Sequence, residues 1–196
     1  MHVDTLKKII KNLVYFLLVI LFYINQSYAN ERWRIDKDIS KISFEVPVLF
    51  TTNVKGSFKD IDGFVQLDTK DREKNKAIFS VSINSIEINY QKYKDLLLSP
   101  IFFNASKYPL GVLDTKSFLY TNNEISKLEI ELTIKNKTIK IPINLKVNQL
   151  TQDLVQIKGK LFFLRSNFNI GIGNWKNTTI LKDKVELNYD IFLFRE

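Results

Sequence analysis

The sequence predicts an all-β protein, with about eight strands that are mostly antiparallel and one short helix near residues 90–99. Two patterns in the chain carry this prediction. Beyond residue 32, apolar and polar residues alternate over long spans, which places the apolar side chains of each strand on one face. Residues 85–100 break that alternation and space their apolar side chains three and four residues apart, as a helix does.

The individual strands follow from the alternating series. The clearest series cover residues 42–48, 79–83, 128–134, 139–147 and 185–193, and weaker ones cover 54–58, 61–68, 110–118 and 154–165. The polar link Lys-Asn-Lys at 135–137 predicts an antiparallel hairpin. Pro142 cannot donate to a strand ladder, so we expect it at an edge or a bulge. Strands with one polar face each are typical of a single sheet curved around its own interior, or of a sandwich.

The predicted helix precedes a short apolar run. Tyr90, Tyr93, Leu96 and Leu97 have helical spacing, and Pro100 is expected to end the helix. The run at 96–103, Leu-Leu-Leu-Ser-Pro-Ile-Phe-Phe, follows directly. It has two interpretations, because it could plug one end of the β-structure or line the mouth of an apolar cavity.

Residues 1–29 have the order of a secretory signal peptide, with lysines first, an apolar run at 13–24 and the small-residue site Ser-Tyr-Ala. As a helix, that apolar run would be about 18 Å long, short of the roughly 30 Å of hydrocarbon in a bilayer. We therefore expect cleavage after Ala29 rather than a retained anchor. The folded domain would then be residues 30–196, in the periplasm.

Composition narrows the possible functions. The 196 residues include no Cys and a single His, His2, which the expected cleavage removes. Without either residue, Ser–His–Asp and Cys–His catalysis and ordinary zinc sites are excluded, and no metal or cofactor is expected. The carboxylate pairs Asp60/Asp62 and Asp68/Asp71 are interpreted as solvated turn residues rather than as a glycosidase pair. A cysteine-free exported chain fits a bacterial periplasm.

Charge gives a further indication about partners. The net charge of +8 falls to +6 when the leader, with its three lysines and one aspartate, is removed. The basic residues form no Arg-rich helix and do not alternate with aromatic residues, which argues against nucleic-acid binding. A weak contact with anionic membrane surfaces is the expected consequence of this charge.

Five blocks of the sequence resemble the YceI family of lipid- and polyisoprenoid-binding, lipocalin-like periplasmic proteins. They are WRIDKDISKISFEV at 33–46, VKGSFKDIDGFVQLD at 54–68, SINSIEIN at 82–89 with SPIFFNASKYP after it, LTIKNKTIKIPI at 132–143 and LRSNFNIGIG at 164–173. The resemblance implies an antiparallel lipocalin-like β-barrel over residues 30–196.

The chain departs from the family at polar positions. Ile39, Val48, Leu96 and Ile101 stand where the family usually has His, His, His and Asp. Each change replaces a polar side chain with an aliphatic one, so the family's contacts to a ligand headgroup are not expected here. The apolar tail of a ligand would then dominate its affinity.

The resemblance implies a non-enzymatic periplasmic carrier that holds a long-chain isoprenoid or a similar amphiphilic lipid. One alternative is a barrel or sandwich with a filled interior, acting as an envelope or stress-related module through its surface. Another is an enzyme acting on a lipid. The oligomeric state, monomer or homodimer, is left open. The candidate ligand-lining residues, each equally a core residue by its pattern, are Phe44, Phe58, Phe79, Val81, Ile83, Leu97, Phe102, Phe103, Ile130, Leu132, Ile141, Ile143, Phe163, Leu187 and Ile191.

Arg165 is singled out because it ends the apolar strand Lys-Leu-Phe-Phe-Leu. One interpretation is that its stem covers the barrel end while the guanidinium stays in water. The other is that it borders the cavity mouth, where it would be a donor for a ligand oxygen or a partner of Asp36 or Asp190.

Overall fold

The computed structural model describes residues 31–49, 53–68, 71–88, 91–119 and 126–196. Its strands are β1 (Glu31–Ile35), β2 (Lys41–Val46), β3 (Val54–Phe58), β4 (Ile61–Leu67), β5 (Lys76–Ser82), β6 (Ile86–Ile88), β7 (Leu110–Asp114), β8 (Ser126–Ile134), β9 (Lys137–Thr151), β10 (Leu154–Leu164) and β11 (Lys184–Arg195). The helices are α2 (Gln91–Leu98) and the short 3-10 turns η1 (Arg72–Lys74), η2 (Ile83–Ser85), η3 (Arg165–Phe168) and η4 (Gly173–Lys176).

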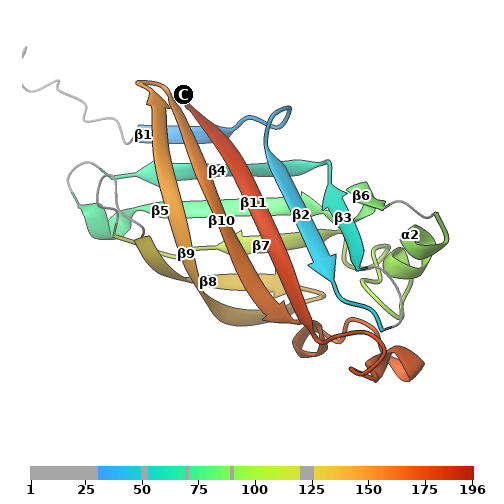
Figure 1. The fold of residues 1–196 in the computed structure, drawn as a ribbon. Coiled ribbons are helices and arrows are strands. Elements are labelled where there is room, and N and C mark those ends of the chain that lie inside the picture. Colours follow the sequence, from blue (N-terminus) through green and yellow to red (C-terminus); the bar gives the residue numbers. More distant parts are fainter. Residues whose placement is uncertain (1–30, 50–52, 69–70, 89–90, 120–125) are drawn as a thin grey trace, which may run out of the picture.

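The strands form a closed antiparallel barrel (Figure 1). Eight of them follow one another around the ring in the order β1-β4-β5-β7-β8-β9-β10-β11, and β11 closes the ring by pairing with β1. The other three extend the wall, because β2 continues along β11, β3 pairs with β2, and β6 pairs with β3. The predicted eight-stranded barrel is therefore confirmed, with each of its first three strands bent into two pieces.

The turn and the proline follow the sequence prediction. The β8–β9 hairpin turns at Lys135 and Asn136, whose φ angles of 50° and 57° fit a two-residue turn that matches the twist of the strands. Pro142 pairs with Glu129 of β8, whereas the ladder between β9 and β10 ends at Asn144 and Lys160. At Pro142, β9 therefore has a partner strand on one side only, as expected for a residue that cannot donate.

The bent strands leave one sheet edge that the helix covers. Among the described strands, β6 pairs with β3 alone, and α2 lies against it. The helix is confirmed close to its predicted position and ends two residues before Pro100. After it, residues 99–109 fold back on the barrel, where the amide of Ile83 donates to the carbonyl of Pro109 at 2.8 Å. An exposed edge invites pairing with another chain, so this cover has a clear physical role.

Two cations tie the segments at this end of the barrel together. The ammonium of Lys135 donates to the carbonyls of Phe102, at 2.5 Å, and Asn169, at 2.8 Å, and burial lowers the pKa of Lys135. Arg165 joins the turn after β10 to the segment before β11. We call the three segments that they connect, residues 91–109, 135–137 and 165–183, the plug end (Figure 1).

The contacts of Arg165 contradict the interpretation that its guanidinium stays in water, and they differ from the partners that were expected for it at the cavity mouth. The residue is only 2% exposed, so the guanidinium does not reach water. It donates to four backbone carbonyls, those of Ile170, Gly171, Leu181 and Lys182, at 2.8–3.2 Å. It therefore pairs with neither Asp36 nor Asp190, and Asp190 instead binds Gln156 and Lys158. A pattern of apolar neighbours could not show that the carbonyls of two loops converge on this side chain.

The expected signal peptide, residues 1–29, lies outside the described residues. Within the part of the chain that the structure describes, no helix is long and apolar enough to cross a membrane.

Replacing Arg165 with Met tests whether its hydrogen bonds to the four loop carbonyls stabilise the protein. Arg165→Met keeps the apolar stem and leaves buried carbonyls without donors, so the free energy of unfolding should fall by about 2–4 kcal/mol. Arg32→Met is the matched control, because Arg32 is 49% exposed and pairs with Glu196 at the surface, where a pair contributes about 0–1 kcal/mol. Urea denaturation measures the free energy of unfolding of both variants. Equal decreases in the two would show that the hydrogen bonds of Arg165 do not hold the loops together.

Candidate functional site

The barrel encloses one large apolar cavity of about 1140 Å³. Its lining comes from all eight strands of the ring, from β2 and β3, and from α2 and the turns of the plug end. Natural interiors are close-packed, with few voids larger than a water molecule, and ligand pockets have volumes of about 300–1,000 Å³. A cavity of this size is therefore a feature of the fold rather than a packing defect.

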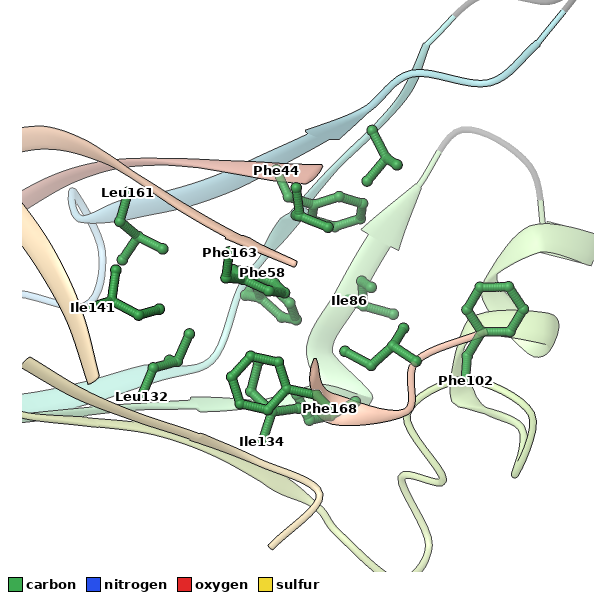
Figure 2. Close-up of a cluster of buried hydrophobic side chains, with 14 of the residues drawn as sticks. Phe44, Phe58, Ile86, Phe102, Leu132, Ile134, Ile141, Leu161, Phe163 and Phe168 are labelled. Carbon is green, nitrogen blue, oxygen red and sulfur yellow. The ribbon is translucent and has the colours of Figure 1, made fainter. Parts of the chain in front are cut away.

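The structure brings most of the predicted lining residues together. Those that line the cavity are Phe44, Phe58, Phe79, Val81, Ile83, Leu97, Phe102, Phe103, Leu132, Ile143, Phe163, Arg165, Leu187 and Ile191. Ile130 and Ile141, which pair with each other across β8 and β9, are buried in the core but are not part of the lining. Figure 2 shows Ile141 packed with Leu132 and Leu161 in the cluster of buried side chains.

The run at 96–103 fits both of its interpretations, because it plugs one end of the barrel and also lines the cavity. Phe102 is buried in the core cluster and packs edge-on against Trp175, with ring centroids 5.7 Å apart. Leu96, Leu97 and Phe103 line the cavity. The same segment therefore closes this end of the barrel and forms part of the cavity wall.

Glycines on neighbouring strands let three aromatic rings lie against the barrel wall. Phe44, Phe79 and Tyr189 line the cavity, and each is paired across the sheet with a glycine, Gly56, Gly63 and Gly159 respectively. A β-carbon at any of these glycines would overlap the ring opposite. The missing side chains thus give the rings room at the wall.

Tyr189 shows how dry this wall is. Burial raises the pKa of Tyr189 to about 12, because an ionised phenolate would lose its hydration there. Its hydroxyl donates to the carbonyl of Asn144 at 3.2 Å. The phenol therefore remains neutral, and its hydrogen-bonding capacity is used within the wall.

Polar side chains gather at the two ends of the cavity. At one end are Glu31 and Arg195, whose charged atoms are 3.7 Å apart. Two buried donors there, the indole Nε1 of Trp33 and Nε of Arg195, have no hydrogen-bond partner among the described residues. Lys92, in the first turn of α2, lines the other end and is exposed. A ligand would thus meet a long apolar wall with donors at both ends.

The positions that depart from the family fall into two groups. Val48 and Leu96 line the cavity, so their aliphatic side chains make its wall more apolar. Ile39 and Ile101 are exposed at the surface. Only two of the four positions that were expected to differ from the family therefore lie at the cavity.

Sequence reasoning missed several lining residues. Trp175 lies in the short turn η4 and Leu181 in the segment before β11, and neither belongs to a strand whose alternation could have placed it. The glycine–aromatic pairs were also missed, although glycine inside a strand is a known sign of close approach by a neighbouring group. Among the described residues, no group of three or more His, Cys, Asp or Glu could hold a metal ion. Asp68 and Asp71 shape a turn, as predicted, since each carboxylate accepts a nearby backbone amide.

Comparisons with known proteins agree on one family. A family model described as the YceI-like domain matches residues 33–193. Protein YceI of Salmonella newport is 26% identical over 139 residues, which cover 70% of this chain and 72% of that protein.

Solved structures share the fold. The crystal structure of BcnA from Burkholderia cenocepacia superposes with a TM-score of 0.73 at 24% identity, covering 81% of this chain and 98% of that one. A polyisoprenoid-binding domain from Saccharophagus degradans, implicated in plant cell wall breakdown, gives a TM-score of 0.69 at 13% identity and covers 84% and 98% of the two chains. These likenesses establish the barrel architecture.

The glycine–aromatic arrangement can be tested with one methyl group. Gly56→Ala would overlap the Phe44 ring and the carbonyl of Glu87 on β6, and it should lower the free energy of unfolding by about 1–3 kcal/mol, as overpacking does. Gly111→Ala is the control, because its new methyl would come no closer than 3.3 Å to Val81. Denaturation curves compare the two. If Gly56→Ala cost no more than Gly111→Ala, the ring would not depend on this glycine.

Proposed function

The chain belongs to the YceI-like family, and on that premise we propose that it is a non-enzymatic periplasmic carrier that holds a long-chain isoprenoid or a similar amphiphilic lipid inside the barrel. The observation that carries this proposal is the apolar cavity of about 1140 Å³ that extends through the barrel. The polyisoprenoid-binding domain of Saccharophagus degradans, which has the same fold, supports an isoprenoid as the kind of ligand.

The size of the cavity calls for an occupant. Unfilled space inside a protein is destabilising, because the side chains that line it lose packing contacts. Water is a poor occupant of most of this space, because each water molecule needs two to four polar partners and the wall offers mainly aliphatic and aromatic carbon. An apolar chain fits the wall better.

The apolar tail would supply most of the affinity. Burial contributes about 0.8 kcal/mol per CH₂ group, whereas a hydrogen bond to a headgroup adds only about 0.5–1.5 kcal/mol. Val48 and Leu96 make the wall more apolar, so the carrier should select its ligand by the tail more than by the headgroup. The absence of His and Cys from residues 30–196 supports binding rather than catalysis.

The alternative of a filled barrel rests on the loss of the family's polar side chains. Three of the aromatic side chains that line the cavity, Phe44, Phe79 and Tyr189, lie over glycines of the neighbouring strands. This observation favours the carrier over the filled module.

The direct test is to identify what the protein carries. The full chain is expressed with its leader in a bacterial host, and the exported protein is extracted with organic solvent for mass spectrometry. We expect a near-stoichiometric lipid with a long apolar chain, and an N-terminus at or within a residue or two of Asn30. Recovery of no such lipid would contradict the proposal.

A substitution that partly fills the cavity provides a second test, and the same substitution outside the cavity is its control. Val81 lines the cavity on β5, and its neighbour Ile78 does not. Val81→Phe should displace about two CH₂ groups of a bound chain and weaken binding roughly tenfold. Ile78→Phe adds the same bulk outside the cavity and should leave lipid binding unchanged. Equal lipid affinity in both variants would place the ligand elsewhere.

A further inference from the structure

Positive charge is concentrated at one end of the molecule. The three segments of the plug end carry eight basic residues and two acidic ones, whereas the rest of residues 30–196 carries eighteen of each. The whole net charge of the expected mature chain therefore lies where α2 and the turns around η3 and η4 meet (Figure 1). The basic residues are Lys92, Lys94, Lys107, Lys135, Lys137, Arg165, Lys176 and Lys182.

The charges of the plug end are not neutralised by ion pairs. Every ion pair recorded among the described residues joins side chains outside the three segments, such as Lys160 with Glu186 at 2.6 Å and Lys140 with Glu129 at 3.1 Å. The two acidic residues of the plug end accept hydrogen bonds from neutral groups instead, Asp95 from Gln91 and Asp183 from Ser166. The barrel wall thus balances its charges locally, and the plug end does not.

Exposed aliphatic side chains share this end. Ile172 and Ile180 of the plug end are 46% and 44% exposed, and Ile101 and Leu49 are 39% and 37% exposed. Backbone hydrogen bonds hold them in two pairs, from Ile172 to the carbonyl of Ile101 at 3.1 Å and from Leu49 to the carbonyl of Ile180 at 2.8 Å.

The buried Arg165 connects the two pairs. Its guanidinium binds the carbonyl of Gly171, next to Ile172, and the carbonyl of Leu181, next to Ile180. The aliphatic side chains are therefore carried by loops whose backbone is fixed, and exposed lysines flank them in the sequence at Lys176 and Lys182.

We propose that the plug end is a docking surface for an anionic lipid bilayer. Lysines are attracted to the negative lipid phosphates, and exposed aliphatic side chains can enter the boundary between headgroups and acyl chains. Each lysine near such a surface strengthens binding about fivefold. This surface goes beyond the carrier function, and its binding to vesicles does not require a lipid in the cavity. Docking would also bring Lys92, at the cavity end beside α2, to the bilayer.

Vesicle co-sedimentation of the exported protein tests the proposal. We expect binding to vesicles that contain phosphatidylglycerol, little binding to phosphatidylcholine vesicles, and weaker binding as salt is added, because salt screens exposed charges. The triple variant Lys107→Gln, Lys137→Gln, Lys176→Gln takes one lysine from each segment. It should lower the affinity for anionic vesicles about a hundredfold.

A triple variant of the barrel wall is the matched control. Lys41, Lys127 and Lys146 are exposed on β2, β8 and β9, and changing them to Gln removes the same total charge. This variant should retain most of the vesicle binding. Equal losses in the two triple variants would reduce the effect to net charge and overturn the docking surface, as would a wild-type protein that does not bind anionic vesicles.

Replacement of an exposed aliphatic side chain tests the apolar contribution. Ile172→Ser should reduce the binding that remains at high salt, whereas Leu150→Ser, at a 48% exposed position of β9 outside the plug end, should not. Indistinguishable binding of these two variants at high salt would contradict the insertion of Ile172. The lipid content of each variant, measured by solvent extraction, separates a failure of docking from a failure of the carrier function.

Discussion

The structure depends on how a closed sheet of eight strands uses its interior. A barrel of this size is just wide enough for side chains to fill it or for one small ligand to occupy it, so the inward side chains decide which occurs. Here the rings of Phe44, Phe79 and Tyr189 lie over glycines of the neighbouring strands. The glycines leave space at the wall, and the three rings occupy it. The proposed function depends on the cavity that these rings help to line.

The plug end closes one end of the barrel, and this closure results from the bends in the strands. The bends that separate β1 from β2, β4 from β3 and β5 from β6 leave β6 as a sheet edge, and α2 and residues 99–109 cover it. A cover made of loops needs partners for its backbone carbonyls. Lys135 and Arg165 supply them, with donors directed to carbonyls from several segments. Both cations lose hydration by this burial, which lowers the pKa of each. The hydrogen bonds that they donate to the loop carbonyls offset this cost and fix the loops.

Features that depend on neighbouring residues could be predicted from the sequence, whereas contacts between distant segments could not. Alternation is local and strong, so the strands, the hairpin at Lys135 and Asn136 and the helix before Pro100 could be placed from the chain alone. The inward face of each strand followed as well, which is why most of the predicted lining residues do line the cavity. Ile130 and Ile141 have the same pattern, yet they are buried in the core cluster without lining the cavity. The hydrogen bonds of Arg165 could not be predicted, because its partners are backbone carbonyls of loops, and loops show no regular spacing of apolar residues.

The aliphatic substitutions relative to the family gain a physical meaning from their positions. Val48 and Leu96 extend the apolar wall to the end of the cavity beside α2, while Ile101 adds to the exposed surface of the plug end. This end of the barrel therefore combines an apolar cavity wall with lysines that form no recorded ion pair among the described residues. Together these features favour a ligand held by its tail and a protein that works next to anionic lipid.

A crystal structure of the exported protein, purified without detergent or added lipid, tests the central claim most directly. The account predicts continuous elongated density along the cavity, in contact with Phe44, Phe79 and Val81, with the rings still lying over their glycines. Density for water molecules alone, or rings turned inward to meet across the axis, would contradict it.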